Sequence, residues 1–557
     1  MSTVPPRFSL MPIAQLLGGV VRRFFAREDV RFILHCVVLL FLLSVLRPMF
    51  SAMAPGASYE SPVVVWSLIN EDLLRIAAGA QQHRLPSLHV LFLVVPTLVL
   101  LITRRRLTWR AWESGYSLRA LVMVMLGLLA WSGATFEYNI YLNQSHAFDR
   151  LLLVGLVALS WRTPLAVPFA ARWAILMIEE AYVPIPIDDF DFRPVGEILI
   201  VFSCFAWASL RRSFATKHFL LVALGVWASY YYAAGVSKVN YGPAWSWLLD
   251  NHLSNIAVNA HVRGWLGFVS DSTFLAFASV ARRFDIVLAG FTLVVELSAL
   301  VCFVHPRFIR TWLLLCVVLN GGIYLFTGIF FWKWMATSLA LCFFLRRGGA
   351  GIVKKMCRQK AVVLFAIFIV YHSRLRLYYN PQTGVAWYDS RFLENYILYA
   401  VGPSGQRYLV SPSYLTPMET HWVQGRLCYA TNERSLTGIY GTIGNHNVLQ
   451  RLESLSAPEE ALTLLNSGVR CTNPKRQEVF DEFFIRYFGN LNRYGRSLHW
   501  LRWVEMPTHL WVQPQGNLYK QQEPVERIEL WREIVVHHGG ALHRLETRKV
   551  HEVPIPL

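Results

Sequence analysis

Charged residues are scarce in this chain of 557 residues. Asp, Glu, Lys and Arg together make up 16% of it, whereas 54% of the residues are apolar and 14% are aromatic. Soluble domains carry about 25% charged residues. The composition therefore excludes an ordinary soluble protein and predicts a protein that crosses a membrane several times.

Acidic residues are scarcer than basic ones, since 35 Asp and Glu stand against 53 Lys and Arg, for a net charge of +18. Residues 1–372 hold 33 basic against 18 acidic residues, while residues 373–557 hold 20 against 17. The excess thus lies in loops between apolar runs, where basic residues mark the cytoplasmic side of a membrane. We expect membrane lipids as surroundings and no nucleic-acid partner.

Common catalytic motifs are missing as well. The chain has no Walker loop, no Gly-x-Ser-x-Gly, no His-Glu-x-x-His and no Cys-x-x-Cys pair, so an ATPase, a hydrolase of that type and a zinc enzyme lack direct support. His537, His538 and His543 in "VHHGGALHR" have no companion cluster. We interpret these three as surface histidines rather than as metal ligands.

Only eight cysteines are present, and six of them fall in apolar runs or on the inner side. Cys428 and Cys471 alone lie in the C-terminal part. They can form one disulfide in an oxidising compartment or remain two free thiols, and the sequence leaves both open.

Apolar runs long enough for membrane helices dominate the first two thirds of the chain. Basic clusters follow every second run, which predicts a cytoplasmic N-terminal segment at 1–31 and a transmembrane domain at 32–372. An odd number of spans then puts residues 373–557 outside. The eleven predicted spans are 32–53, 86–103, 119–136, 150–161, 164–183, 195–210, 218–236, 284–304, 311–328, 331–346 and 361–372.

The composition changes after residue 372 to that of a water-soluble α+β domain. "ENYILYAVGPSGQRYLVSP" predicts two strands around a Gly-Pro-Ser-Gly turn, and "PVERIELWREIVV" predicts another strand. "PEEALTLLNSG" and "KRQEVFDEFFIRYFGNLNRYG" have helical spacing and stop near a glycine. We therefore predict a helical membrane bundle of about eleven spans with an exoplasmic α+β domain at 373–557.

Two long outer segments interrupt the spans, at 54–85 and 237–283. The first is amphipathic enough to lie along the membrane surface. The second exceeds an ordinary connection, which indicates a function or a re-entrant piece.

Lys238 ends an apolar run in "YYYAAGVSKVNYGPAWSWLL", after the small residues Ala233, Ala234 and Gly235. A lysine in a poorly hydrated cavity can become a neutral general base, and the small residues let a helix or a flat ligand approach closely. Equally, a lysine at the end of a span can reach the interface beside Trp245 and Trp247 as an anchor. The residues alone leave both interpretations open.

The pattern of Tyr232, Ala233, Gly235, Ser237 and Lys238 with a tryptophan following resembles the HTTM superfamily. That superfamily is the membrane domain shared by vitamin K-dependent gamma-glutamyl carboxylase and many bacterial proteins. Glu296 in "TLVVELSALVCFVHPRFIR" and the paired spans of "LLLCVVLNGGIYLFTGIFFWKWMATSLALCFF" are similar too. The resemblance covers about residues 30–346.

The resemblance implies an HTTM-like fold in a bacterial inner or plasma membrane and a carboxylase, or lyase-type, reaction on an exoplasmic peptide or protein substrate. It implies a reduced quinone as cofactor and Lys238 as the base that deprotonates it. Asn320 stands where relatives often carry a histidine. We take Lys238, His252 and Glu296 as candidate catalytic residues, and Gly235, Trp245, His146 and Asn320 as candidate ligand-binding residues.

Glu296 and His146 each have a plainer interpretation. Glu296 can pair two helices within the membrane, and His146 can be a solvated loop histidine. His252 and His261 can be neighbours of Lys238, although nothing local requires it.

Two other functions remain open. A glycosyltransferase that uses a lipid donor can employ acidic residues of the outer loops to bind a metal or to activate a hydroxyl. A non-enzymatic protein can use the bundle as a socket for a lipid or partner, in export or assembly. The acidic candidates are Glu71, Asp72, Asp188, Asp189 and Asp191.

Overall fold

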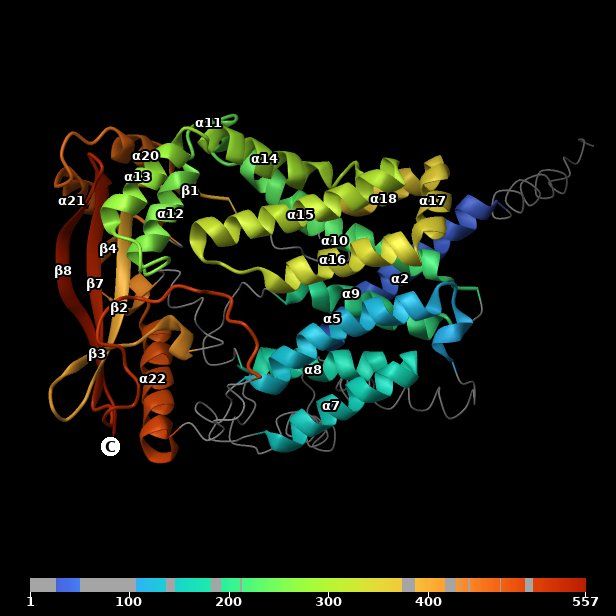
Figure 1. The fold of residues 1–557 in the computed structure, drawn as a ribbon, viewed down its shortest axis with the longest axis horizontal. Coiled ribbons are helices and arrows are strands. Elements are labelled where there is room, and N and C mark those ends of the chain that lie inside the picture. The colour runs from blue at the N-terminus through green and yellow to red at the C-terminus, as the bar shows by residue number, and fades with distance from the viewer. Residues whose placement is uncertain are drawn as a thin grey trace, which may run out of the picture.

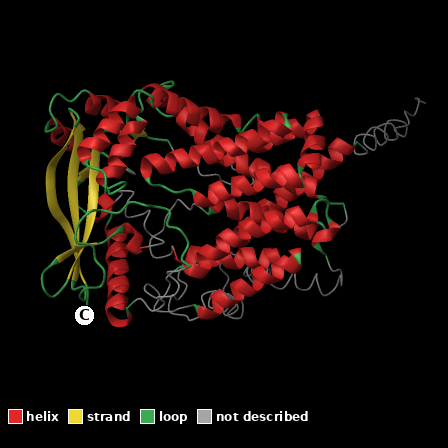
Figure 2. Ribbon diagram, viewed as in Figure 1, coloured by secondary structure: helices red, strands yellow, loops and turns green. Residues whose placement is uncertain are grey.

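The protein has a helical bundle at one end and an antiparallel sheet with its own helices at the other (Figure 1, Figure 2). The sheet belongs to the C-terminal part of the chain, which confirms the coarse architecture expected from the composition. The computed structural model describes residues 27–50, 107–136, 146–181, 192–210, 213–372, 386–415, 427–431, 433–438, 441–470, 472–495 and 504–556.

Helix α10 (Thr216–Val239) is the centre of the bundle, because it is buried along nearly its whole length. It packs against α2 (Glu28–Phe50), α9 (Arg193–Ala208), α14 (Asp285–Ser298) and α18 (Lys360–His372). The remaining bundle helices are α5 (Gly115–Thr135), α7 (Ala147–Arg162), α8 (Val167–Ala181), α15 (Pro306–Thr327), α16 (Trp332–Arg347) and α17 (Ala350–Arg358).

Among the residues that the structure describes, four helices are long and apolar enough to cross a membrane. They lie at Glu28–Arg47, Gly115–Thr135, Thr216–Val239 and Pro306–Thr327, and α16 with α17 makes a fifth if this pair, bent by 85°, is one span. A span needs about 20 residues, whereas α7, α8, α9, α14 and α18 have 13 to 16. Every predicted span on described residues overlaps a helix, while the run 86–103 lies outside them.

The sheet has the order β3-β2-β7-β8, and all its pairs are antiparallel. The predicted strand pair around the Gly-Pro-Ser-Gly turn is confirmed as β2 (Phe392–Val401) and β3 (Arg407–Leu409), and the later predicted strand is β7 (Arg527–His538). The short strands β1 (Tyr388–Asp389), β4 (Arg434–Ser435), β5 (Thr442–Ile443) and β6 (Val469–Arg470) form two further pairs.

Aromatic residues of one helix fill the space over the sheet. Both predicted helices of this region are confirmed, as α21 (Glu460–Leu465) and α22 (Pro474–Tyr494), and a third helix is α20 (His446–Glu453). The buried face of α22 contributes Phe480, Phe483, Phe484 and Phe488 to one hydrophobic cluster with residues of β2, β7 and β8.

Strand β8 (Ala541–Pro554) was not predicted. It pairs with β7 through a turn at Gly539 and Gly540, whose φ angles of 59° and 78° are accessible mainly to glycine. Two histidines of "VHHGGALHR" therefore end β7 and a third lies near the start of β8. No group of three or more potential metal ligands occurs among the described residues.

The long segment at 237–283 connects the bundle to the sheet. It forms α11 (Ser246–Leu249), α12 (Leu253–Val262) and α13 (Asp271–Arg282), and α13 packs against β8 (Figure 1). In return, the segment before β7 reaches the bundle, where Met506 joins the helical core and Leu510 bridges Ile329. The bundle and the sheet region are thus joined by a segment from each of them. The amphipathic stretch 54–85 lies outside the described residues.

Candidate functional site

Lys238 and Glu296 form a buried ion pair at the end of the central helix. Lys238 lies in the last turn of α10, and its Nζ donates to Oε1 of Glu296 on α14 at 2.6 Å. The two side chains are only 11% and 7% exposed. Two of the three candidate catalytic residues are therefore in direct contact, although 58 residues separate them in the chain.

Gly235 makes this pairing possible. A Cβ atom at this position would lie 2.9 Å from Cβ of Glu296 and 3.1 Å from Cδ2 of Leu297. Only a residue without a side chain lets α10 and α14 approach this closely. The close neighbour expected at Gly235 is therefore a helix in this structure.

The second carboxylate oxygen of Glu296 has no hydrogen-bond partner among the described residues. Oε2 is buried and accepts no hydrogen bond within the part of the chain that the structure describes. A buried acceptor left in this state costs about 1–3 kcal/mol, and more when it is charged. The site therefore offers an acceptor that a ligand hydroxyl can satisfy.

The aromatic ring at Lys238 belongs to Trp247, since Nζ lies 5.4 Å from that ring's centroid. Trp247 is buried, and its Nε1 donates to the main-chain oxygen of Trp387 at 2.9 Å. Trp245, the residue we selected from the sequence, is 52% exposed and has a left-handed φ of 62° at the start of α11. It therefore lies on the surface next to the site.

Asp389 continues this chain of contacts into the sheet region. Its Oδ1 accepts from Nε1 of Trp387 at 3.1 Å, and its Oδ2 accepts from Nδ2 of Asn251 at 3.0 Å. Burial raises the pKa of Asp389 to about 7, although these hydrogen bonds oppose the shift. The Asp285 carboxylate raises the pKa further and the Lys238 charge lowers it. Asp389 therefore titrates near neutral pH within reach of the ion pair's charge.

His252 contacts Asp285 rather than the Lys238–Glu296 pair. Its Nδ1 lies 3.3 Å from Oδ2 of Asp285, the first residue of α14. Asp285 also accepts from the main-chain N and the Oγ of Ser254, both at 2.9 Å. His252 is thus part of the polar surroundings, because it contacts Asp285, whose charge acts on Asp389. His261 pairs with Asp271 at 3.1 Å.

Asn320 and His146 lie away from the ion pair. Asn320 on α15 donates to the hydroxyl of Tyr231 at 2.9 Å, about two helical turns before Lys238 on α10. His146 precedes α7, where it is buried and lies 3.3 Å from Oδ2 of Asp149. The solvated-loop interpretation of His146 was therefore wrong, because the residue is 1% exposed at the start of α7, which packs against α5 and α8.

Several residues singled out from the sequence cannot be placed. Glu71, Asp72, Asp188, Asp189 and Asp191 lie outside the described residues. Cys428 is disulfide-bonded, whereas Cys471 also lies outside the described residues.

Sequence reasoning missed Asp389, Asn251 and Trp387. Asn251 and Asp389 are 138 residues apart, and no periodic pattern links them. The available signal was the run of polar residues in "DNHLSN", which follows soon after Trp245 and Trp247 and contains two asparagines.

A small site with one basic and one acidic side chain lies where the bundle meets the sheet. It is formed by Lys238, Glu296, Gly235 and Trp247. Arrangements of this kind can bind a hydroxyl and move its proton. Comparisons of the chain with protein-family models, with curated proteins and with solved structures find no match.

Proposed function

We propose that the chain is an integral membrane protein that binds a lipophilic hydroxyl compound, such as a reduced quinone, at the Lys238–Glu296 pair and uses it in a carboxylase-like modification. The observation that carries the proposal is the buried ion pair, one of whose carboxylate oxygens has no hydrogen-bond partner in the described part of the chain. Buried charges in a membrane bundle are costly and usually mark function.

The proposed topology has about eleven spans, with the shorter helices crossing the membrane together with the long ones. Helix α17, which carries Lys354, Lys355 and Arg358, lies at the end of the bundle remote from the sheet (Figure 1). Basic residues favour the cytoplasmic side. This supports a cytoplasmic N-terminus, an exoplasmic sheet region and a Lys238 site near the outer surface.

The residues fit a ligand that carries an acidic hydroxyl. Oε2 of Glu296 is the atom that can accept the hydroxyl proton, and Nζ of Lys238 then stabilises the negative oxygen. For Lys238 itself to act as base, its own proton must move first to Oε1 of Glu296, 2.6 Å away. A reduced quinone, when bound, supplies both the hydroxyl and the reducing equivalents of the reaction.

A non-enzymatic role in binding or assembly is the second candidate. The observation in its favour is that the same residues join the two ends of the molecule, from Lys238 through Trp247 and Trp387 to Asp389. An ion pair that only holds α10 to α14 needs no ligand. The glycosyltransferase alternative depends on acidic residues that lie outside the described residues.

Quinone binding is the first test. We would purify the wild type, Glu296→Gln and the control Lys333→Met, extract the lipids and quantify quinones by mass spectrometry. Lys333 is a second buried lysine of the bundle, 4.6 Å from the ring centroid of Trp332. We expect quinone in the wild type and the control, and at least tenfold less in Glu296→Gln. Equal amounts in all three, or none, would favour the assembly role.

The proton-transfer role is tested by Lys238→Arg. Arginine keeps the positive charge next to Glu296 but cannot give up its proton at neutral pH. With added reduced quinone we expect oxygen consumption to fall by about 100-fold or more, the usual loss for a missing general base. A variant that keeps full activity would show that Lys238 acts only as a charge.

A further inference from the structure

A cavity of about 640 Å³ lies away from Lys238, between the loop after α12 and the edge of β2. The loop side contributes Arg263, Gly264 and Phe268. The sheet side contributes residues 395–399 of β2, together with Glu533 of β7 and Arg544 and Thr547 of β8. Val410 and Leu415, which follow β3, form an apolar part of the wall. Lys238, Glu296 and Asn320 are not among the lining residues, so this cavity is separate from the site described above.

The edge of β2 that borders the cavity is left unpaired by a proline. Strand β3 pairs with β2 from Val401 to Tyr399, and the main-chain N of Val410 then donates to the oxygen of Leu398 at 2.9 Å. The same register would place Pro412 opposite Tyr396. Proline has no N–H, and the chain turns there into a 3₁₀ helix at Pro412–Leu415. The ladder therefore stops before Tyr396.

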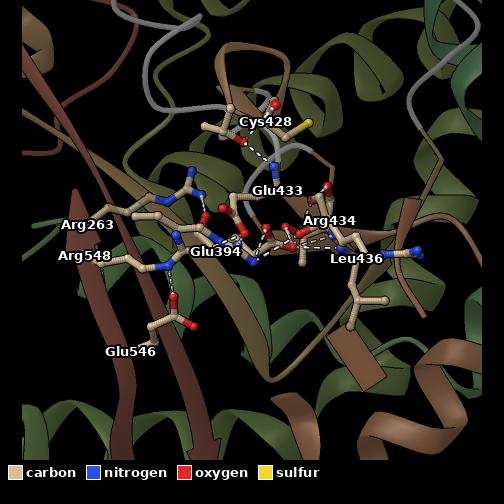
Figure 3. Close-up of polar contacts among 12 residues, drawn as sticks. Arg263, Glu394, Cys428, Glu433, Arg434, Leu436, Glu546 and Arg548 are labelled. Atoms are coloured by element: carbon tan, nitrogen blue, oxygen red, sulfur yellow. Dashed lines mark hydrogen bonds and ion pairs between the residues drawn. The ribbon is translucent and has the colours of Figure 1, made fainter. Parts of the chain in front are cut away.

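The main chain of Tyr396 faces the cavity. In an antiparallel strand, the N–H and C=O of residues i, i+2 and i+4 point to the same edge. The main-chain oxygen of Leu398 points to the β3 side. The main-chain oxygen of Glu394 accepts a hydrogen bond at 3.5 Å from Nη2 of Arg263, a residue at the end of α12 (Figure 3). Tyr396 lies between these two residues.

The described residues offer the main chain of Tyr396 no other hydrogen-bond partner at this edge. Within the described residues, no hydrogen bond to its N–H or C=O from outside the main sheet is found. The residue is only 7% exposed. Unpaired buried polar groups are costly, so a ligand that supplies partners to this main-chain N–H and C=O gains affinity here.

We propose that this cavity binds an extended peptide, which adds a short strand to the sheet at Tyr396. An extended chain presents alternate N–H and C=O groups at the spacing that the free edge of β2 requires. An apolar side chain of the peptide then contacts Ile397, and Phe268, 86% exposed at the rim, can cover it. The proposal does not depend on the chemistry at Lys238, because it concerns binding alone.

Peptide binding to the full chain in detergent tests the proposal. The probe is a fluorescent, capped hexapeptide of alternating Thr and Val, and its control is the same peptide N-methylated at the central residues, which removes the main-chain donors. We expect saturable binding of the probe and at least tenfold weaker binding of the control. Equal binding of both peptides, or no binding, would overturn the proposal.

Two variants and an exchange measurement locate the binding. Ile397→Lys places a charge in the cavity, whereas Val469→Lys changes a 73% exposed valine of β6 that does not line it. We expect only the first to weaken binding tenfold. In the wild type, the probe should slow deuterium exchange of the Tyr396 amide, a readout that needs no variant. Slow exchange without any peptide would mean that another segment of this chain occupies the edge, and the proposal would be wrong.

Discussion

The size of one side chain decides whether the ion pair of the bundle forms. Gly235 has room for no Cβ atom, because Glu296 and Leu297 of α14 lie directly against it. Gly290, on α14 itself, has its nearest neighbour at 3.9 Å and is open. A glycine-to-alanine substitution is therefore expected to have opposite effects on stability at Gly235 and at Gly290.

We expect Gly235→Ala to destabilise the protein. The added methyl group overpacks the α10–α14 contact, which costs about 1–3 kcal/mol, while the better helix propensity of alanine returns about 1 kcal/mol. Gly290→Ala should gain the propensity without the clash. Thermal unfolding in detergent measures both, and a melting temperature of Gly235→Ala at or above that of Gly290→Ala would contradict the close approach.

At the scale of elements, α10 and α14 are joined by one buried charge pair. Removing a single partner leaves the other charge buried and uncompensated, at a cost of about 3–5 kcal/mol, whereas replacing both by apolar residues is often neutral. This separates a structural from a functional role for Lys238 and Glu296, because only function suffers from the double replacement.

We therefore expect Glu296→Leu to lower stability by about 3 kcal/mol or more and Lys238→Met/Glu296→Leu to recover most of it. Denaturant unfolding of the wild type, both single variants and the double variant gives the coupling energy. If the double variant is as stable as the wild type and still retains quinone, the pair is only a helix–helix contact. A coupling energy near zero would contradict the 2.6 Å contact itself.

At the scale of the whole molecule, Asp389 makes the junction between the bundle and the sheet sensitive to pH. Its folded pKa is about 7 against an ordinary value of 3.8. Between these values the folded state holds a proton that the unfolded state has lost, so stability falls as the pH rises toward 7 and is constant above it. At about 1.4 kcal/mol per unit, the loss reaches about 4 kcal/mol.

Asp389→Asn should remove this dependence. We expect the melting temperature of the wild type to fall between pH 5 and pH 8. We expect this fall in melting temperature to be smaller in Asp389→Asn. Glu459→Gln, a change at an exposed residue, serves as control. An unchanged difference in Asp389→Asn would mean that Asp389 is ionised throughout this range.

Much of the fold could be predicted from local patterns. Apolar runs marked the helices of the bundle, and the strand pair of β2 and β3 followed from alternation around a glycine turn. Strand β8 escaped because "ALHRLETRKVHEVP" is polar, and its strand character comes from pairing with β7. Helices of 13 to 16 residues, such as α9 and α14, show why apolar content alone does not determine the number of full spans.

The candidate site divides in the same way. Lys238, Glu296 and Gly235 could be chosen from the sequence, because an ionisable residue in an apolar run and a glycine before it are local features. Trp247 instead of Trp245 at the lysine was not predictable, because the tight turn at the start of α11 decides which ring points inward. Asp389 likewise meets Asn251 only in the folded chain.

By itself the sequence determined that the chain is apolar and helical over its first two thirds, that a less apolar region with strands follows, and that a lysine ends the central helix. Those properties depend on composition and on residues within a few turns of one another. Only the tertiary structure decided that Glu296 neutralises that lysine, that Asp389 joins the two ends and that Pro412 leaves one strand edge open. The reason is physical, because each of these features needs two surfaces far apart in the chain to pack together.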